Sequence, residues 1–127
     1  MITHLLLVAA GGAIGASLRY LSGIGLTRIL GAGFPYGTLF VNVVGSFAMG
    51  ILIAWLARRS AGDTDLRLLL ATGLLGGFTT FSAFSLDAVT LYERGALIAA
   101  AFYVLASVLV SIAALVGGLA LVRGLAG

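Results

Sequence analysis

The sequence predicts an all-α integral membrane protein with four transmembrane helices in a single domain that covers residues 1–127. Hydrophobic residues make up 61% of the chain and charged residues only 9%, whereas an average soluble domain is roughly 25% charged. A chain this short has little interior in which to bury so much apolar surface. Four apolar stretches of about 20 residues can each cross a hydrocarbon core of roughly 30 Å. They are approximately residues 2–26, 37–56, 66–91 and 96–122.

The first apolar stretch begins at the N-terminus, where a signal peptide is the alternative interpretation. The segment MITHLLLVAAGG lacks a basic n-region and a clear A-x-A cleavage site, so it is interpreted as the start of the first transmembrane helix. His4, the single histidine, is expected at the membrane interface rather than in a ligand role. Gly11, Gly12 and Gly15 are expected at a close helix–helix contact, because small residues are common at such contacts in membranes.

The second and fourth stretches carry polar or small residues at four-residue spacing. This spacing places each set on one face of a helix. Helix packing explains either set about as well as a pore lining does. The two sets together, one of which includes an asparagine, favour a polar track. The sets are Thr38, Asn42, Ser46 and Gly50 in the second stretch, and Tyr103, Ser107 and Ser111 in the fourth.

The third stretch contains the segment GLLGGFTTFSAF, residues 73–84, which is a poor sequence for a continuous helix. A break there is one interpretation, and a flexible helix whose glycines pack against neighbours is the other. Broken backbone within a membrane is tolerated only where it is buried in protein or lines a cavity. Its carbonyls would suit a cation and its amides an anion. Phe81 and Phe84 share one helical face, where they either pack or present their positive ring edges to an ion.

The charged side chains are seven arginines and four acidic residues, and the sequence contains no lysine. The arginines lie in loops and at helix ends, which favours contact with lipid headgroups over binding to nucleic acid. With no cysteine, the chain has no disulfide, thiolate metal site or catalytic thiol. The arginines show only a weak bias between the two sides of the membrane, which leaves insertion in both orientations open. One side has Arg58, Arg59, Arg67 and Arg123, and the other has Arg28, Arg94 and possibly Arg19.

Acidic residues are nearly absent from the predicted spans, which bears on the charge of any transported ion. Asp63 and Asp65 are expected in a loop and Glu93 at a span end, so only Asp87 falls within a span. A cation path usually shows acidic rings, whereas hydroxyl and amide donors suit a small anion. Arg19 could add positive potential at a vestibule or extend to the headgroups.

Three segments resemble successive signatures of the Fluc (CrcB) fluoride channel family: GGAIGASLRY, PYGTLFVNVVGSFAMG and GLLGGFTTFSAFSLD. The fourth span resembles the family in its Tyr-x-x-x-Ser-x-x-x-Ser stripe. The resemblance implies an antiparallel, dual-topology homodimer with two fluoride pathways and with third helices that break where they cross. It also implies a structural sodium ion (Na+) at the dyad, held by the backbone carbonyls of Gly76 and Thr79. Gly76 is expected to tolerate substitution poorly, because a broken helix often needs dihedral angles that a β-carbon forbids.

The resemblance further implies a fluoride pathway of seven side chains, with Arg19 in a vestibule or structural role. The chain departs from the family pattern at Ala83, where threonine is common, and at Asp87, where glutamate is common. The first departure removes a hydroxyl, and the second shortens the reach of a carboxylate. The seven pathway residues are Thr38, Asn42, Phe81, Phe84, Tyr103, Ser107 and Ser111.

The predicted function is a fluoride-selective channel, not an enzyme, that passively exports cytoplasmic fluoride across a bacterial inner membrane and gives fluoride resistance. Its expected partners are a second copy of the chain, fluoride and the lipid bilayer, with no nucleic acid. Two alternatives are a small proton-coupled multidrug-type exporter and a non-transporting membrane assembly subunit. The exporter needs a carboxylate in its first helix, and the first stretch here contains none.

Overall fold

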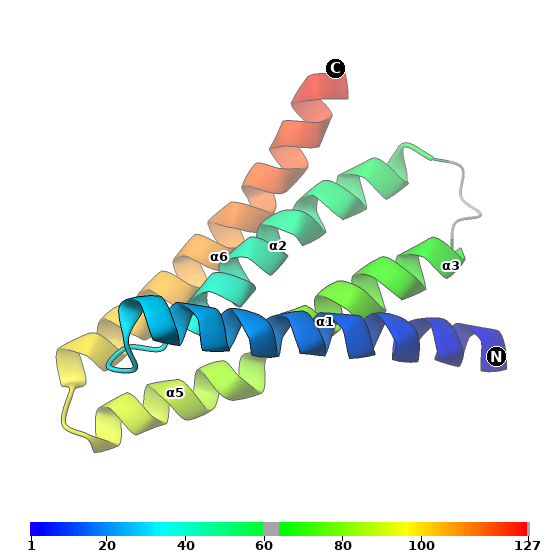
Figure 1. The fold of residues 1–127 in the computed structure, drawn as a ribbon. Helices are drawn as coiled ribbons and strands as arrows, with labels where there is room; N and C mark the ends of the chain where they lie inside the picture. The colour runs from blue at the N-terminus through cyan, green and yellow to red at the C-terminus, as the bar shows by residue number, and fades with distance from the viewer. Residues whose placement is uncertain (60–63, 127) are drawn as a thin grey trace.

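The computed structural model describes residues 1–59 and 64–126 as a bundle of long helices (Figure 1). Four helical segments within these residues are long and apolar enough to cross a membrane, so the predicted four-span, all-α architecture is confirmed. Asp63 lies outside the described residues, and Asp65 lies in a helix rather than in the expected loop. The elements are α1 (Ile2–Leu30), α2 (Tyr36–Ala57), α3 (Thr64–Arg67), the π-helix η1 (Leu68–Leu75), α4 (Gly76–Phe78), α5 (Phe81–Glu93) and α6 (Leu97–Ala126).

Helix α1 and helix α5 are each followed by a glycine with a positive φ. The α1–α2 loop and the α5–α6 turn that begin there lie next to each other. Gly31 has φ 87° and its amide donates to the Thr27 carbonyl at 2.8 Å. Gly95 has φ 80° and turns the chain from α5 into α6. Glycine adopts this conformation without the penalty that a β-carbon brings. The α1–α2 loop and the α5–α6 turn therefore lie side by side, where Arg94 Nη2 donates to the Gly33 carbonyl at 2.9 Å.

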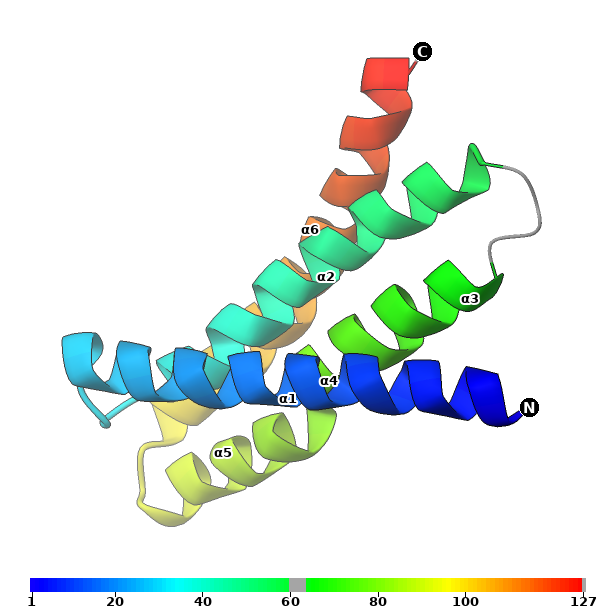
Figure 2. The same ribbon diagram turned by 45° about the vertical axis from the view of Figure 1, so that its right-hand side comes forward.

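The packing of α2 along α6 depends on two glycines (Figure 2). A β-carbon at Gly50 would overlap the Leu115 carbonyl oxygen of α6, and one at Gly118 would overlap the Phe47 carbonyl oxygen of α2. The helix backbones thus touch directly, as small residues allow in membrane helices. Helix α1 approaches η1 in the same way at Gly11 and Gly15, so the predicted close contact of these glycines is confirmed.

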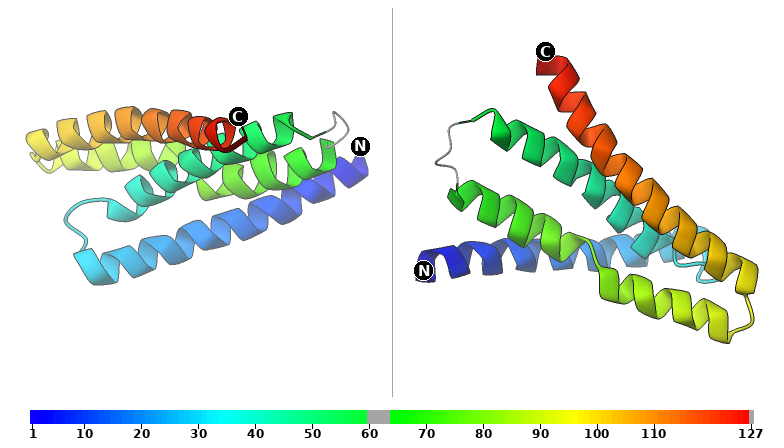
Figure 3. Two further views of the ribbon diagram at one scale, coloured as in Figure 1. Left: turned by 90° about the horizontal axis from the view of Figure 1, so that it is seen from above. Right: turned by 180° about the vertical axis from the view of Figure 1, so that it is seen from behind.

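The third span changes course at two extended residues between α4 and α5. Thr79 has φ −86° and ψ 158°, and Thr80 has φ −154° and ψ 121°. Figure 3 shows α5 displaced sideways from the preceding helical segment at this step. Gly76, by contrast, has helical dihedral angles of −62° and −38°, so the expectation that its backbone would forbid a β-carbon is wrong. The crowded glycine is Gly77, where a β-carbon would lie 2.7 Å from the Gly12 carbonyl oxygen.

Candidate functional site

The extended step in the third span is held by a side chain from α2. Asn42 Nδ2 donates to the Thr80 carbonyl at 3.0 Å, and the Thr80 amide donates to Asn42 Oδ1 at 2.7 Å. Thr79 closes the preceding segment, because its amide and its hydroxyl both donate to the Leu75 carbonyl. The Thr80 hydroxyl caps α5 by accepting from the Ala83 amide at 3.1 Å. The Thr79 amide bond is the last helical bond of the preceding segment, whereas the bonds to Asn42 and the cap on Ala83 hold Thr80 outside the helical conformation.

These bonds release two backbone carbonyls from the helical pattern. In a continuous α-helix the amide of residue i donates to the carbonyl of residue i−4. The Thr80 amide would then bond the Gly76 carbonyl, but it bonds Asn42 instead. The Ala83 amide would bond the Thr79 carbonyl, but it bonds the Thr80 hydroxyl. The carbonyls of Gly76 and Thr79 are therefore free of their usual donors and can accept from, or coordinate, another group.

Arg19 contacts the same step from α1. Its Nε donates to the Gly77 carbonyl at 3.0 Å, which a continuous helix would pair with the Phe81 amide. The side chain is half-buried, so it is not simply extended into the headgroup region. Arg19 thus brings a guanidinium group to the step and gives a hydrogen-bond donor to the Gly77 carbonyl.

A narrow cavity of about 350 Å³ lies beside the step and is mostly apolar. The hydroxyl oxygens of Ser107 and Ser111 are buried and have no hydrogen-bond partner among the described residues. A buried hydroxyl without a partner loses its bonds to water, at a cost of about 1–3 kcal/mol. Because both serines also line this cavity, their hydroxyls are candidates to donate to a polar occupant. Its lining comprises Asn42, Ser46, Thr79, Thr80, Phe81, Phe84, Ser107, Val108, Ser111 and Ile112.

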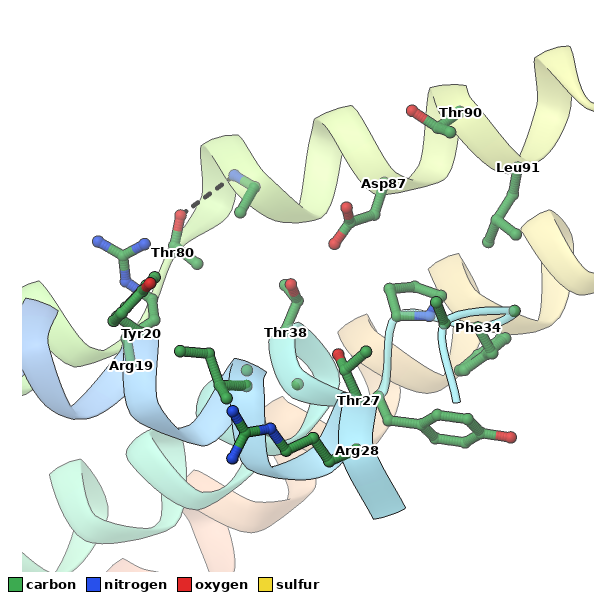
Figure 4. Close-up of a pocket in the computed structure, with 18 of the residues that line it drawn as sticks. Arg19, Tyr20, Thr27, Arg28, Phe34, Thr38, Thr80, Asp87, Thr90 and Leu91 are labelled. Atoms are coloured by element: carbon green, nitrogen blue, oxygen red, sulfur yellow. Dashed lines mark hydrogen bonds between the residues drawn. The ribbon is translucent and has the colours of Figure 1, made fainter. Parts of the chain in front are cut away.

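A wider cavity of about 670 Å³ adjoins the other side of Thr80 (Figure 4). Its lining includes three guanidinium groups, those of Arg19, Arg28 and Arg94, and one carboxylate, that of Asp87. Figure 4 shows Asp87 directed from α5 into this space, with Thr38 and Arg28 reaching into it from other helices. The excess of fixed positive charge raises the local concentration of small anions. Thr80 also lines the narrow cavity, so it lies between the two cavities.

Tyr103 lies in the core and is absent from the residues that line either cavity. It is fully buried, and its hydroxyl donates to Asp87 Oδ2 at 3.2 Å. The Tyr103 ring lies 5.3 Å from the Phe84 ring, which itself lies 5.5 Å from the Phe81 ring. Tyr103 therefore connects the polar end of the wide cavity to the aromatic wall of the narrow one.

The structure thus distributes the residues implied by the resemblance over two cavities and the core. Thr38 and Arg19 line the wide cavity, and Tyr103 lies in the core between the helices. The sequence predicted no place in the site for Thr80, and Arg28 and Arg94 were used only in the charge bias between the two sides of the membrane. The segment GGFTT, residues 76–80, could have drawn attention to Thr80. Its pairing with Asn42 of α2 could not be predicted, because it joins residues that are 38 positions apart. The narrow cavity takes Asn42, Phe81, Phe84, Ser107 and Ser111 together with Thr79.

Metal-ligating side chains do not cluster in the part of the chain that the structure describes. No group of three or more histidine, cysteine, aspartate or glutamate residues could hold a metal ion there. His4 instead pairs with Asp65, with 3.4 Å between Nε2 and Oδ1, and both side chains are exposed.

The chain is similar in sequence to a defined group of membrane proteins. Residues 6–119 match the family described as CrcB-like protein, Camphor Resistance (CrcB). A relative from Agrobacterium fabrum is 59% identical over 122 residues, which cover 96% of this chain and 98% of the relative. A relative from Chelativorans sp. is 60% identical over 122 residues, which cover 96% of this chain and 98% of the relative. A relative from Cereibacter sphaeroides is 58% identical over 124 residues, which cover 98% of each chain. All three carry the name Fluoride-specific ion channel FluC, which is that of a channel rather than an enzyme.

Proposed function

Because the chain belongs to the CrcB-like family, we propose that it is a fluoride-specific channel through which cytoplasmic fluoride leaves the cell passively. It is a multi-pass membrane protein, in bacteria one of the inner membrane. The observation that carries the proposal is the narrow cavity with the unpartnered hydroxyls of Ser107 and Ser111. The family supplies the identity of the ion, and this cavity supplies the chemistry that fits it.

Fluoride is a compact and strongly hydrated anion, so a path across the membrane must replace its water with hydrogen-bond donors. The narrow cavity offers the Ser107 and Ser111 hydroxyls and the amide of Asn42, and its lining contains no carboxylate. The rings of Phe81 and Phe84 can add their positive edges without adding a full charge. An anion would enter through the wide cavity, past the arginines, and pass Thr80 into the narrow one.

The proposed direction of transport follows from the chemistry of hydrogen fluoride. In an acidic medium, neutral hydrogen fluoride crosses the bilayer and dissociates in the cytoplasm, where the anion accumulates. A passive channel then allows fluoride to leave down its gradient, without ATP or a covalent step. Such a channel would make the cell resistant to fluoride.

Reconstitution of the purified chain into liposomes tests the proposed function. With valinomycin present, so that potassium can leave with the anion, liposomes loaded with potassium fluoride should release fluoride to a fluoride-selective electrode. Liposomes loaded with potassium chloride should retain chloride under the same conditions. Transport of a drug-like cation that requires an opposing proton gradient, with no release of fluoride, would favour the exporter. The absence of release of either anion would contradict the channel and favour an assembly subunit.

We further propose that two copies form an antiparallel, dual-topology homodimer. The released carbonyls lie in the middle of the third span. Two exposed residues lie there as well: Gly76 and Phe81, and the exposed fraction of Phe81 is 77%. Lipid cannot satisfy free carbonyls, and a second copy crossing at the step would cover them.

C-terminal reporters should be found on both sides of the membrane. Lysines added to one set of loops should force a single orientation and stop flux until an oppositely fixed variant is co-expressed. Reporters on one side alone would contradict dual topology.

A structural sodium ion at the centre of this dimer is the third part of the proposal. The carbonyls of Gly76 and Thr79 from two copies would provide four oxygen ligands, and unwound backbone carbonyls coordinate sodium in other membrane proteins. Protein prepared entirely without sodium should lose flux or dissociate, and sodium should restore it. Unchanged flux and an unchanged dimer after exhaustive removal of sodium would contradict this site.

Replacement of the two phenylalanines by isoleucine separates contact with the ion from packing. Phe81 is 77% exposed in the protomer, whereas Phe84 is 8% exposed and packs against Tyr103. Both Phe81→Ile and Phe84→Ile should lower fluoride flux strongly, because each removes a positive ring edge. Only Phe84→Ile should also lower the free energy of unfolding, by about 1 kcal/mol. Flux assays and thermal unfolding measure the two effects.

Phe40→Ile is the matched control, because Phe40 is partly exposed on α2 and lines neither cavity. This variant should conduct fluoride like the parent. If Phe81→Ile and Phe84→Ile also conduct like the parent, the rings do not contact the permeating anion.

A further inference from the structure

The α1–α2 loop carries an aromatic side chain into the core beside Tyr103. The ring of Phe34 lies 5.4 Å from the Tyr103 ring at an interplanar angle of 88°, which is an edge-to-face contact. Phe34 also lies 6.2 Å from Phe102, the neighbouring residue on α6. Its side chain is half-buried and lines the wide cavity. Phe34 thus lies between the fully buried Tyr103 and the wide cavity.

The loop that carries Phe34 is fastened at both ends. The amide of Gly31 bonds the last turn of α1, and the Tyr36 amide donates to the Phe34 carbonyl at 2.8 Å where α2 begins. Between them, Arg94 Nη2 donates to the Gly33 carbonyl at 2.9 Å, which ties the loop to the α5–α6 turn. The position of the Phe34 ring therefore depends on contacts with three helices.

The Tyr103 ring is confined between Phe34 on one side and Phe84 on another. Because the hydroxyl direction follows the ring, these contacts set the direction in which Tyr103 donates to Asp87. Asp87 is the one carboxylate among the residues that line the wide cavity. A hydroxyl that donates to a carboxylate stabilises its charge and lowers its power to repel a nearby anion.

From these contacts we infer that Phe34 is a positioning residue for conduction. It holds Tyr103 so that the Tyr103 hydroxyl stays on Asp87, and Arg94 holds the loop that presents Phe34. This inference extends the proposed function and rests on it for its effect on flux. Without the Phe34 ring, Tyr103 can move toward the wide cavity, and the unmasked Asp87 carboxylate then opposes entry of the anion.

The first measurement does not depend on transport. Tyr20, Tyr36 and Tyr92 are exposed, at 68%, 38% and 66%, so their replacement by phenylalanine leaves Tyr103 as the single tyrosine. Ultraviolet resonance Raman spectra of this protein report whether the Tyr103 hydroxyl donates a hydrogen bond. Phe34→Leu should shift the tyrosine signature toward a weaker donor, and Arg94→Ala should shift it in the same direction. Phe40→Leu, the matched control, should leave it unchanged.

The second measurement is fluoride flux in liposomes, in the parent background. Phe34→Leu should lower flux about threefold to tenfold, because loss of one edge-to-face aromatic pair shifts the population in which Tyr103 is held on Asp87 by about that factor. Phe34→Tyr keeps the ring, so it should conduct to within about twofold of the parent, because the edge-to-face contact is retained. A merely space-filling role would instead be met by leucine, which would then conduct as well as tyrosine.

The outcomes separate the inference from the function on which it rests. An unshifted tyrosine signature in Phe34→Leu overturns the inference, whether or not the parent conducts. A shifted signature with full fluoride flux overturns the link between Tyr103 and conduction. A parent that releases no fluoride contradicts the proposed function, and the Raman comparison still decides whether Phe34 positions Tyr103.

Discussion

Asn42→Asp should abolish fluoride flux through this protein. The Asn42 amide lines the narrow cavity, donates to the Thr80 carbonyl and accepts from the Thr80 amide. Aspartate would place a full negative charge there and set a carboxylate oxygen against the Thr80 carbonyl oxygen. Two like charges about 4 Å apart repel by about 4 kcal/mol at an effective dielectric constant of about 20. That energy corresponds to a loss of about a thousandfold in rate.

Asn42→Ala is the companion variant, because it removes both hydrogen bonds to Thr80 without adding charge. It should lose less flux than Asn42→Asp, although the step would be held less firmly. Both variants need to elute as the parent does on size-exclusion chromatography before their rates are compared. Asn42→Asp that conducts at a tenth of the parent rate or better would mean that fluoride does not pass close to this side chain.

Gly118→Ala should prevent α2 and α6 from packing. Its β-carbon would overlap the Phe47 carbonyl oxygen and lie 2.9 Å from the Ile51 nitrogen and 3.2 Å from the Gly50 carbonyl carbon. These atoms all belong to the backbone of α2, so no side chain can move aside. Overpacking of this kind costs typically 1–3 kcal/mol and sometimes more, a large part of the stability of a small domain. Thermal unfolding in detergent and the yield of monodisperse protein measure the loss.

Gly117→Ala provides a control from the adjacent position. Gly117 lies in the same helix, and no other atom of the protomer that could clash lies within 4 Å of a β-carbon added there. It should fold like the parent, or slightly better, because alanine favours a helix by up to about 1 kcal/mol over glycine. Equal stability of the two alanine variants would show that the α2–α6 contact is looser than the structure has it.

Composition and hydropathy were sufficient to predict the four spans and the membrane location. These properties are local, because each stretch of about 20 apolar residues must cross the bilayer whatever its neighbours are. Glycine spacing likewise predicted the close contact at Gly11 and Gly15, since only small residues let helices approach so closely. The sequence was a poorer guide at Gly76, where the expected break of the third helix suggested unusual dihedral angles that the structure does not have.

Tertiary structure alone decided how the polar residues are used. Four-residue spacing put Tyr103 on the same face as Ser107 and Ser111, yet Tyr103 is enclosed by aromatic rings while the serines line a cavity. The step at Thr80 is held by Asn42, which lies 38 residues earlier in the chain. Hydropathy and helical spacing describe the preferences of each segment. The hydrogen-bond partner of a freed backbone group is set by which helices pack together, and that depends on the whole chain.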